Sequence, residues 1–132
     1  SLHEQSKIKN LLSIFLINWE SHNNSLLSSL KIFYSTFIVI AVDEKKQKAT
    51  GCSIDTLYNE IKKLEQLFKL DFLDSSILHL KINEKIKSIV FTEIQNIEDS
   101  NTLFFDTTIK KKKEIDNWLI PMKDGWCNAF IK

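Results

Sequence analysis

The chain has 132 residues, of which 43% are hydrophobic, and its 18 basic and 17 acidic side chains leave a net charge of +1. This composition excludes a disordered or collagen-like chain and predicts a single domain over residues 1–132 with one hydrophobic core. All 18 basic residues are lysines, and a net charge near zero gives no electrostatic reason to expect a nucleic acid or an anionic membrane as a partner.

The first predicted element is a long helix over residues 2–21. Its apolar residues recur at steps of three and four: Ile8, Leu11, Leu12, Phe15, Leu16 and Trp19. These steps match the period of one helix face. Ser1 and Glu4 have the spacing of a capping box, and Asn23 and Asn24 favour a left-handed exit from the helix.

A β-hairpin is predicted to follow this helix. Residues 30–34 show the alternation of a strand, and residues 37–42 form an unbroken apolar run. An unbroken run predicts a central strand that is buried on both faces. It is also the longest apolar stretch, and its six residues are too few for a membrane-spanning helix, which needs about 20.

A second helix is predicted over residues 53–68, where apolar residues keep the helical period throughout. Ser53 is the expected N-cap, since serine side chains accept hydrogen bonds from the free backbone N–H groups of a helix start. Asp55 would lie in the first turn, where its negative charge complements the helix dipole.

The rest of the chain predicts a second hairpin, with strands at residues 78–82 and 86–91. Shorter elements follow it: a helix over residues 93–99, a strand over 103–105, and a helix over 108–118 that Pro121 ends. We therefore expect an α+β fold, with a mostly antiparallel sheet of four to five strands, two long helices on one face and a short C-terminal helix.

Glycine content excludes the common phosphate-binding motifs. A P-loop needs two glycines five positions apart, and a dinucleotide-binding fingerprint needs three within six positions. This chain has only Gly51 and Gly125. It is therefore not a P-loop ATPase.

Metal and cofactor sites are not expected either. The three histidines and two cysteines show none of the paired spacings that place two ligands on one zinc ion. Two cysteines, Cys52 and Cys127, are also too few for a disulfide framework, although a single bridge between them stays open. We expect a cytoplasmic protein.

The segment from Gly51 to Asp55 is the sharpest local feature, because it joins a predicted strand to a predicted helix start. A cysteine at a helix start has its thiolate stabilised by the dipole, so Cys52 is a candidate nucleophile. Asp43, Asp55 or His22 would assist it. The alternative is structural: Gly51 allows a tight turn, Cys52 packs as a small apolar residue, and Ser53 caps the helix.

The C-terminal segment carries Trp118, Lys123, Asp124 and Trp126. Two indole rings near a terminus either fasten the tail onto the core or form a binding surface, since aromatic residues are enriched in interfaces. The lysine run at residues 110–113 is interpreted as a solvated face. It lacks interleaved aromatic residues and arginine, which argues against nucleic-acid binding.

Five segments taken together resemble a family of small Bacteroidota proteins. They are Trp19-x-x-His22, residues 37–44, Gly51 to Asp55, Asp71 to Asp74, and Trp118 to Trp126. Members of this family are commonly labelled "ABC transporter ATPase", a label that conflicts with the missing P-loop. The resemblance implies a cytoplasmic single-domain protein of uncharacterised activity, with a further N-terminal strand that this chain lacks.

The chain departs from the family at two positions. Ser75 stands where the family tends to have arginine, and Asn23 replaces a glycine. If that arginine served catalysis or anion binding, the role is in doubt here. A composition rich in lysine, isoleucine and asparagine instead indicates AT-rich codons.

Two functions from different classes follow from the sequence. The first is a non-enzymatic binding module that docks a protein partner or a second copy of itself. Its contact residues would be Gly51, Ser53, Trp118, Lys123, Asp124 and Trp126. The second is a small cysteine-dependent enzyme that uses Cys52 at the helix start.

Overall fold

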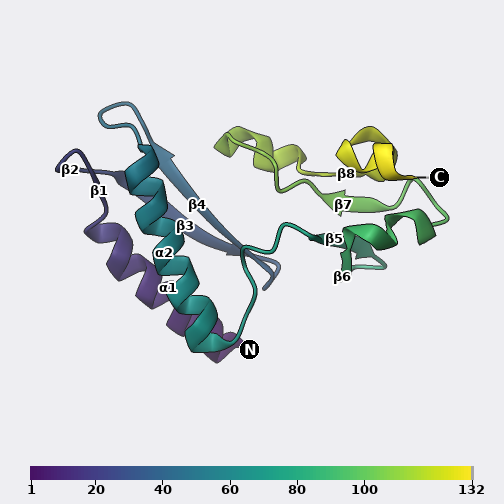
Figure 1. The fold of residues 1–132 in the computed structure, drawn as a ribbon, viewed down its shortest axis with the longest axis horizontal. Helices are drawn as coiled ribbons and strands as arrows, with labels where there is room; N and C mark the ends of the chain where they lie inside the picture. Colours follow the sequence, from purple (N-terminus) through teal and green to yellow (C-terminus); the bar gives the residue numbers. More distant parts are fainter. Residues whose placement is uncertain (132) are drawn as a thin grey trace. The chain divides into compact units, whose positions relative to one another are not determined.

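The computed structural model describes residues 1–131 and has an α+β fold whose sheets are antiparallel (Figure 1). The chain divides into two compact units, Ser1–Leu73 and Asp74–Lys132, and each is described by itself. The expected single domain over residues 1–132 stays a prediction.

Helix α1 (Leu2–Ile17) opens the first unit with the capping box expected from the sequence. The backbone N–H of Glu4 donates to the Ser1 hydroxyl at 3.2 Å, which confirms that part of the prediction. The helix ends earlier than predicted. A short hairpin follows, with strands β1 (Glu20–Ser21) and β2 (Asn24–Ser25), and the left-handed residues His22 and Asn23 form its turn.

The predicted hairpin after this point is confirmed as β3 (Leu27–Phe33) and β4 (Phe37–Asp43), which pair antiparallel from Leu27↔Asp43 to Phe33↔Phe37. The central position predicted for β4 is wrong, because these two strands form a two-stranded sheet. Ile38 and Ile40 pack under the helices, Val39 lies on the opposite face, and all three are half-buried. The apolar run therefore did not require a second neighbouring strand.

Helix α2 (Gly51–Phe68) lies beside α1 over one face of β3 and β4 (Figure 1). Two clusters fill the space between the helices and the strands. Their buried members are Ile8, Leu12, Leu16, Trp19, Leu26, Ile61 and Leu64. Part of each helical pattern thus faces this core, as the sequence predicts. Leu11 of α1 and three residues of the α2 pattern are instead 39% to 65% exposed: Ile54, Tyr58 and Leu67.

The second unit is a four-stranded antiparallel sheet in the order β6-β5-β7-β8. Its strands are β5 (Ile77–Ile82), β6 (Lys85–Val90), β7 (Leu103–Phe105) and β8 (Leu119–Pro121). The predicted hairpin and the strand at residues 103–105 are confirmed. The four-stranded sheet and the two long helices belong to different units, which differs from the expected single sheet with both helices on one face.

The predicted α-helix over residues 108–118 is wrong. Only a short 3-10 helix, η2 (Lys112–Asn117), lies there. Strand β8 pairs with β7 through Phe105↔Leu119, and the N–H of Asp106 donates to the carbonyl of Trp118 at 2.7 Å. Both ends of the segment are therefore held at one edge of the sheet, so it closes as a loop.

One face of this sheet is covered by three 3-10 helices: η1 (Phe91–Asn96), η3 (Met122–Asp124) and η4 (Trp126–Phe130). They contribute Ile94, Met122 and Cys127 to a core with Leu78, Leu80, Ile89 and Phe104 from the strands. The predicted helix over residues 93–99 is thus a 3-10 helix that begins earlier, at Phe91.

Gly125 is fixed by a close approach to this core. A Cβ atom added there would lie 2.5 Å from Cζ of Phe104 and 3.0 Å from Cδ1 of Ile120. Phe104 is fully buried, so its ring has no space into which to move. We expect Gly125→Ala to lower the free energy of unfolding by about 1–3 kcal/mol, measured by chemical denaturation followed by circular dichroism.

Gly51→Ala is the matched control for this prediction. A Cβ at Gly51 meets nothing within 4 Å, and its φ is not positive. Since alanine also favours helices, stability should stay equal or rise slightly. Equal losses of stability in both variants would contradict the close approach at Gly125.

Candidate functional site

The segment from Gly51 to Asp55 forms the first turns of α2, but its cap differs from the prediction. Thr50 is the N-cap, and Ser53 completes a capping box three residues later. The N–H of Ser53 donates to Oγ1 of Thr50 at 3.3 Å, and the N–H of Thr50 donates to Oγ of Ser53 at 2.7 Å. Ser53 is therefore not the N-cap, and Asp55 lies beyond the first turn.

This helix start is joined to the segment that follows α1 by one buried and one partly buried hydrogen bond. The indole Nε1 of Trp19 donates to the carbonyl oxygen of Ser53 at 2.8 Å. The hydroxyl of Ser21 donates to Oγ1 of Thr50 at 3.1 Å. Ser21 and Ser53 are 2% and 3% exposed. We call these four residues, Trp19, Ser21, Thr50 and Ser53, the helix joint, and its polar groups are used in holding the two helices together.

Cys52 is exposed in the first turn of α2. Its candidate helpers His22, Asp43 and Asp55 are exposed as well, and the Asp43 carboxylate accepts the N–H of Lys45 at 3.0 Å. Within residues 1–131 no hydrogen bond or ion pair links Cys52 to any of the three. The cysteine-dependent enzyme stays a prediction to which the structure adds no catalytic pairing.

Cys127 is buried in the core of the second unit, and both cysteines are free thiols. Burial raises the pKa of the Cys127 thiol to about 11, and the negative charge of Asp106 adds to the shift. A thiol held in its neutral form is a poor nucleophile and a poor metal ligand.

Metal centres and membrane spans are absent from the described part of the chain. Residues 1–131 contain no group of three or more His, Cys, Asp or Glu side chains that could hold a metal ion. Within the same residues, no helix has both the length and the apolar character needed to cross a membrane.

The two tryptophans of the C-terminal segment have different environments. Trp118 is buried, and its ring meets that of Phe105 edge-on at 5.1 Å between centroids. Trp126 is 39% exposed. Lys123 and Asp124 are exposed in η3, where the N–H of Lys123 donates to the carbonyl of Ser100. Trp118 thus fastens the segment to the sheet, whereas part of the Trp126 ring is exposed.

Trp126 belongs to an exposed aromatic cluster that sequence reasoning missed. Its ring lies edge-on to Phe130 at 6.1 Å, and Phe130 lies edge-on to Phe91 at 5.9 Å. Phe91 and Phe130 are 41% and 48% exposed. We call these three residues the aromatic patch. Phe91 is far from the other two along the chain, so no local pattern joins them, and only the packing of η1 against η4 does.

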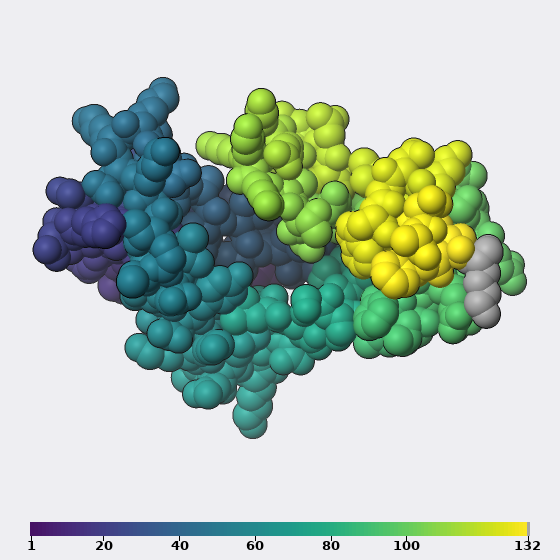
Figure 2. All heavy atoms as spheres, turned by 45° about the horizontal axis from the view of Figure 1, so that its top comes forward, coloured from purple at the N-terminus to yellow at the C-terminus, as the bar shows by residue number. Residues whose placement is uncertain are grey.

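The aromatic patch lies on a rigid support. Trp126 packs edge-on against Phe104 at 6.0 Å, and Phe104 is fully buried. The C-terminal segment that carries two of the three rings, coloured yellow in Figure 2, lies at the surface of the second unit. A row of rings therefore runs from the core to the surface.

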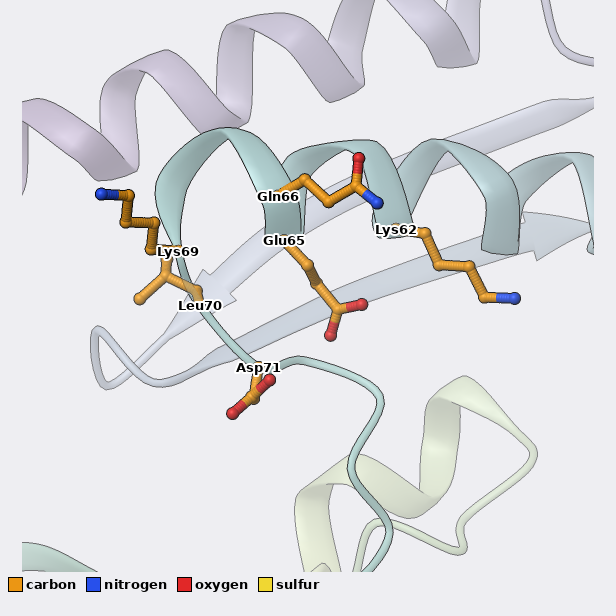
Figure 3. Close-up of a pocket in the computed structure, with 6 residues that line it drawn as sticks. All are labelled: Lys62, Glu65, Gln66, Lys69, Leu70 and Asp71. Atoms are coloured by element: carbon orange, nitrogen blue, oxygen red, sulfur yellow. The ribbon is translucent and has the colours of Figure 1, made fainter.

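A shallow hollow of about 460 Å³ lies at the end of α2, lined by five polar residues and Leu70 (Figure 3). The side chains in Figure 3 point in different directions, and Lys62 and Lys69 point away from each other. Oε2 of Glu65 accepts the N–H groups of Phe72 and Leu73 at 2.7 and 3.1 Å. Glu65 therefore holds the chain after the helix, and the hollow has no convergent binding groups.

Ser75, the position at which the resembling family tends to have arginine, is exposed. It lies between Asp74 and Ser76, which are linked to each other. The hydroxyl and the N–H of Ser76 both donate to Oδ1 of Asp74, and these hydrogen bonds lower the pKa of that carboxyl group. This turn is thus stabilised without an arginine.

Comparison of the chain with protein-family models, with curated proteins and with solved structures finds no match. The resemblance to the Bacteroidota family therefore stays a prediction.

The helix joint predicts a specific loss of stability. Trp19→Phe keeps a large ring in the core but leaves the buried carbonyl of Ser53 without its donor, which should cost about 1–2 kcal/mol in the free energy of unfolding. Trp126→Phe is the matched control, because its indole is partly exposed; the change should stay within about 0.5 kcal/mol. Equal effects in chemical denaturation would argue against the joint.

The different burial of the two cysteines predicts that only one of them is labelled in the native protein. Iodoacetamide should add one group to the native protein, at Cys52, and a second group, at Cys127, only in denaturant; mass spectrometry counts both. If Cys52 reacts no faster than a free model thiol, the enzyme alternative is excluded. A much faster reaction would support it, since activated cysteines are identified by their reactivity.

The raised pKa of Cys127 also predicts a pH dependence. Well below the ordinary thiol pKa of about 8.5, both the folded and the unfolded chain keep the proton, so this group leaves stability unchanged. As pH rises toward 11 the unfolded chain loses the proton first, and stability falls. Cys127→Ala should show a smaller fall than the wild type in urea titrations across this range. Cys52→Ser, the control, should follow the wild type.

Proposed function

We propose that this protein is a non-enzymatic binding module, cytoplasmic in setting, whose aromatic patch docks an apolar segment of a partner protein. The observation that carries the proposal is the contiguous exposure of Phe91, Trp126 and Phe130, between 39% and 48% each. Single exposed apolar residues are common, but neighbouring aromatic ones are typical of interaction surfaces.

The ring contacts beneath the aromatic patch support a role in binding, because they hold the exposed rings in place. Edge-on contacts join Phe91, Phe130, Trp126 and the buried Phe104 in one row. Rings held in this way lose little conformational entropy when a partner covers them, so more of the contact energy is available for affinity. Tryptophan is also among the residues that contribute most to measured interfaces.

The residues of this proposed contact surface differ from those predicted from the sequence. Ser53 and Trp118 are buried, and Ser53 is used within the helix joint. Lys123 and Asp124 are exposed in η3, which directly precedes the segment of Trp126, and they would supply a polar rim. The resemblance to the Bacteroidota family is kept as part of this proposal, since an interaction role needs no P-loop.

Selection from a peptide library displayed on phage tests this function even though the partner is not identified. The wild-type protein should enrich peptides that share apolar or aromatic positions. Phe130→Ala and Phe91→Ala should weaken binding of the selected peptides about tenfold or more, because losses above about 1.4 kcal/mol are typical of central interface residues. Fluorescence anisotropy measures the affinities.

Ile82→Ala is the matched control, since Ile82 is 38% exposed and lies at the end of β5 outside the patch. It should bind like the wild type. The proposal fails if no peptide motif is enriched, or if the selected peptides bind the Phe130 and Phe91 variants as tightly as the wild type.

A further inference from the structure

The outer face of α1 carries a second apolar surface, in the unit without the aromatic patch. Four residues of this face have the spacing of a coiled-coil seam, with steps of four, three and four. They are Lys7, Leu11, Ile14 and Asn18. Leu11 is 39% exposed and Ile14 is 61% exposed. Two apolar positions are thus flanked on the same seam by one polar residue at each end.

This seam borders a groove between α1 and α2 of about 510 Å³. Leu11, Ile14, Phe15 and Trp19 supply its apolar part. Trp19 is held by the helix joint, and its ring lies 6.1 Å from that of Phe15, so this part of the wall is fixed. The charged residues that line the groove are both acidic, Glu20 and Glu60.

We propose that this groove binds α1 of a second copy of the chain, so that the protein forms a two-fold symmetric dimer. The seam is self-complementary when two copies run antiparallel. Leu11 of one copy then lies opposite Ile14 of the other, and Lys7 lies opposite Asn18. Both apolar residues are covered, and both ends of the seam meet a polar partner.

The charges near the seam also favour α1 of a second copy as the occupant, in the antiparallel direction. In the antiparallel register the ammonium group of Lys7 comes next to Asn18 and Glu20 of the other copy. The side-chain N–H of Asn18 already donates to the carbonyl of Ile14, which leaves its oxygen to accept a hydrogen bond from lysine. A parallel pair would instead place Lys7 against Lys7, and like charges at a seam are unfavourable.

Sedimentation equilibrium of the purified chain tests the dimer. The wild type should be a dimer, and Ile14→Glu should weaken association by about 100-fold or more, because an unpaired carboxylate would be buried in the seam. Ile14 is mostly exposed in the single chain, so the fold of the variant should be kept, as circular dichroism can verify. Ile54→Glu, a control at an exposed position outside the groove, should leave the dimer intact.

Charge reversal tests the register. Lys7→Glu should weaken the dimer, and adding Glu20→Lys should restore it, since each ion pair is then rebuilt with opposite signs. A monomeric wild type would overturn the proposal and leave a helix of another protein as the occupant. It is overturned as well if Ile14→Glu dimerises like the wild type, or if Glu20→Lys gives no rescue. The peptide-binding test of the aromatic patch is independent of these results.

Discussion

The hydrogen bond from the indole of Trp19 to the carbonyl of Ser53 is the constraint on which the first unit depends. It links the end of α1 to the start of α2 across 34 positions of sequence. A bond buried in this way is stronger than an exposed one, and leaving either group unpaired would cost more than the bond itself contributes. The same residue closes the base of the β1–β2 hairpin, where the carbonyl of Trp19 accepts the N–H of Leu26 at 2.9 Å, and it also lines the groove.

The elements that local chemistry determines could be predicted from the sequence. Ser1 and Glu4 satisfy each other within one turn, and the hairpin between β5 and β6 turns at Asn83 and Glu84, whose φ angles are positive. The cap of α2 was missed although it is local, because Thr50 and Ser53 have the same three-residue spacing as Ser1 and Glu4. Only the hydrogen bond from Ser21 to Thr50 comes from a distant part of the chain. The other failures occurred where distant residues decide. Residues 108–118 are no α-helix because the pairing of β7 with β8 holds both ends of that segment.

The candidate sites show the same division. Trp126 stands out in the sequence as a large aromatic residue near a terminus, but its partners Phe91 and Phe130 gain significance only when η1 packs on η4. The sequence placed Cys52 directly before the helix, since Ser53 was the expected N-cap, whereas the residue lies in the first turn of α2 behind Thr50. The N–H of Ser53 is used by the capping box with Thr50. The lack of pairing with His22 and Asp43 depends likewise on tertiary positions.

Each proposed surface is supported by a buried ring, Phe104 for the aromatic patch and Trp19 for the groove, and this distinguishes both from isolated exposed apolar residues. Phe104 supports the aromatic patch, and its ring occupies the space that a side chain at Gly125 would fill. Trp19 and Phe15 support the groove, and the helix joint holds Trp19. A change that loosens either support should therefore weaken binding at the surface above it without altering any exposed residue. Binding in the Trp19→Phe variant would report on the groove in this way, since the variant leaves Leu11 and Ile14 in place.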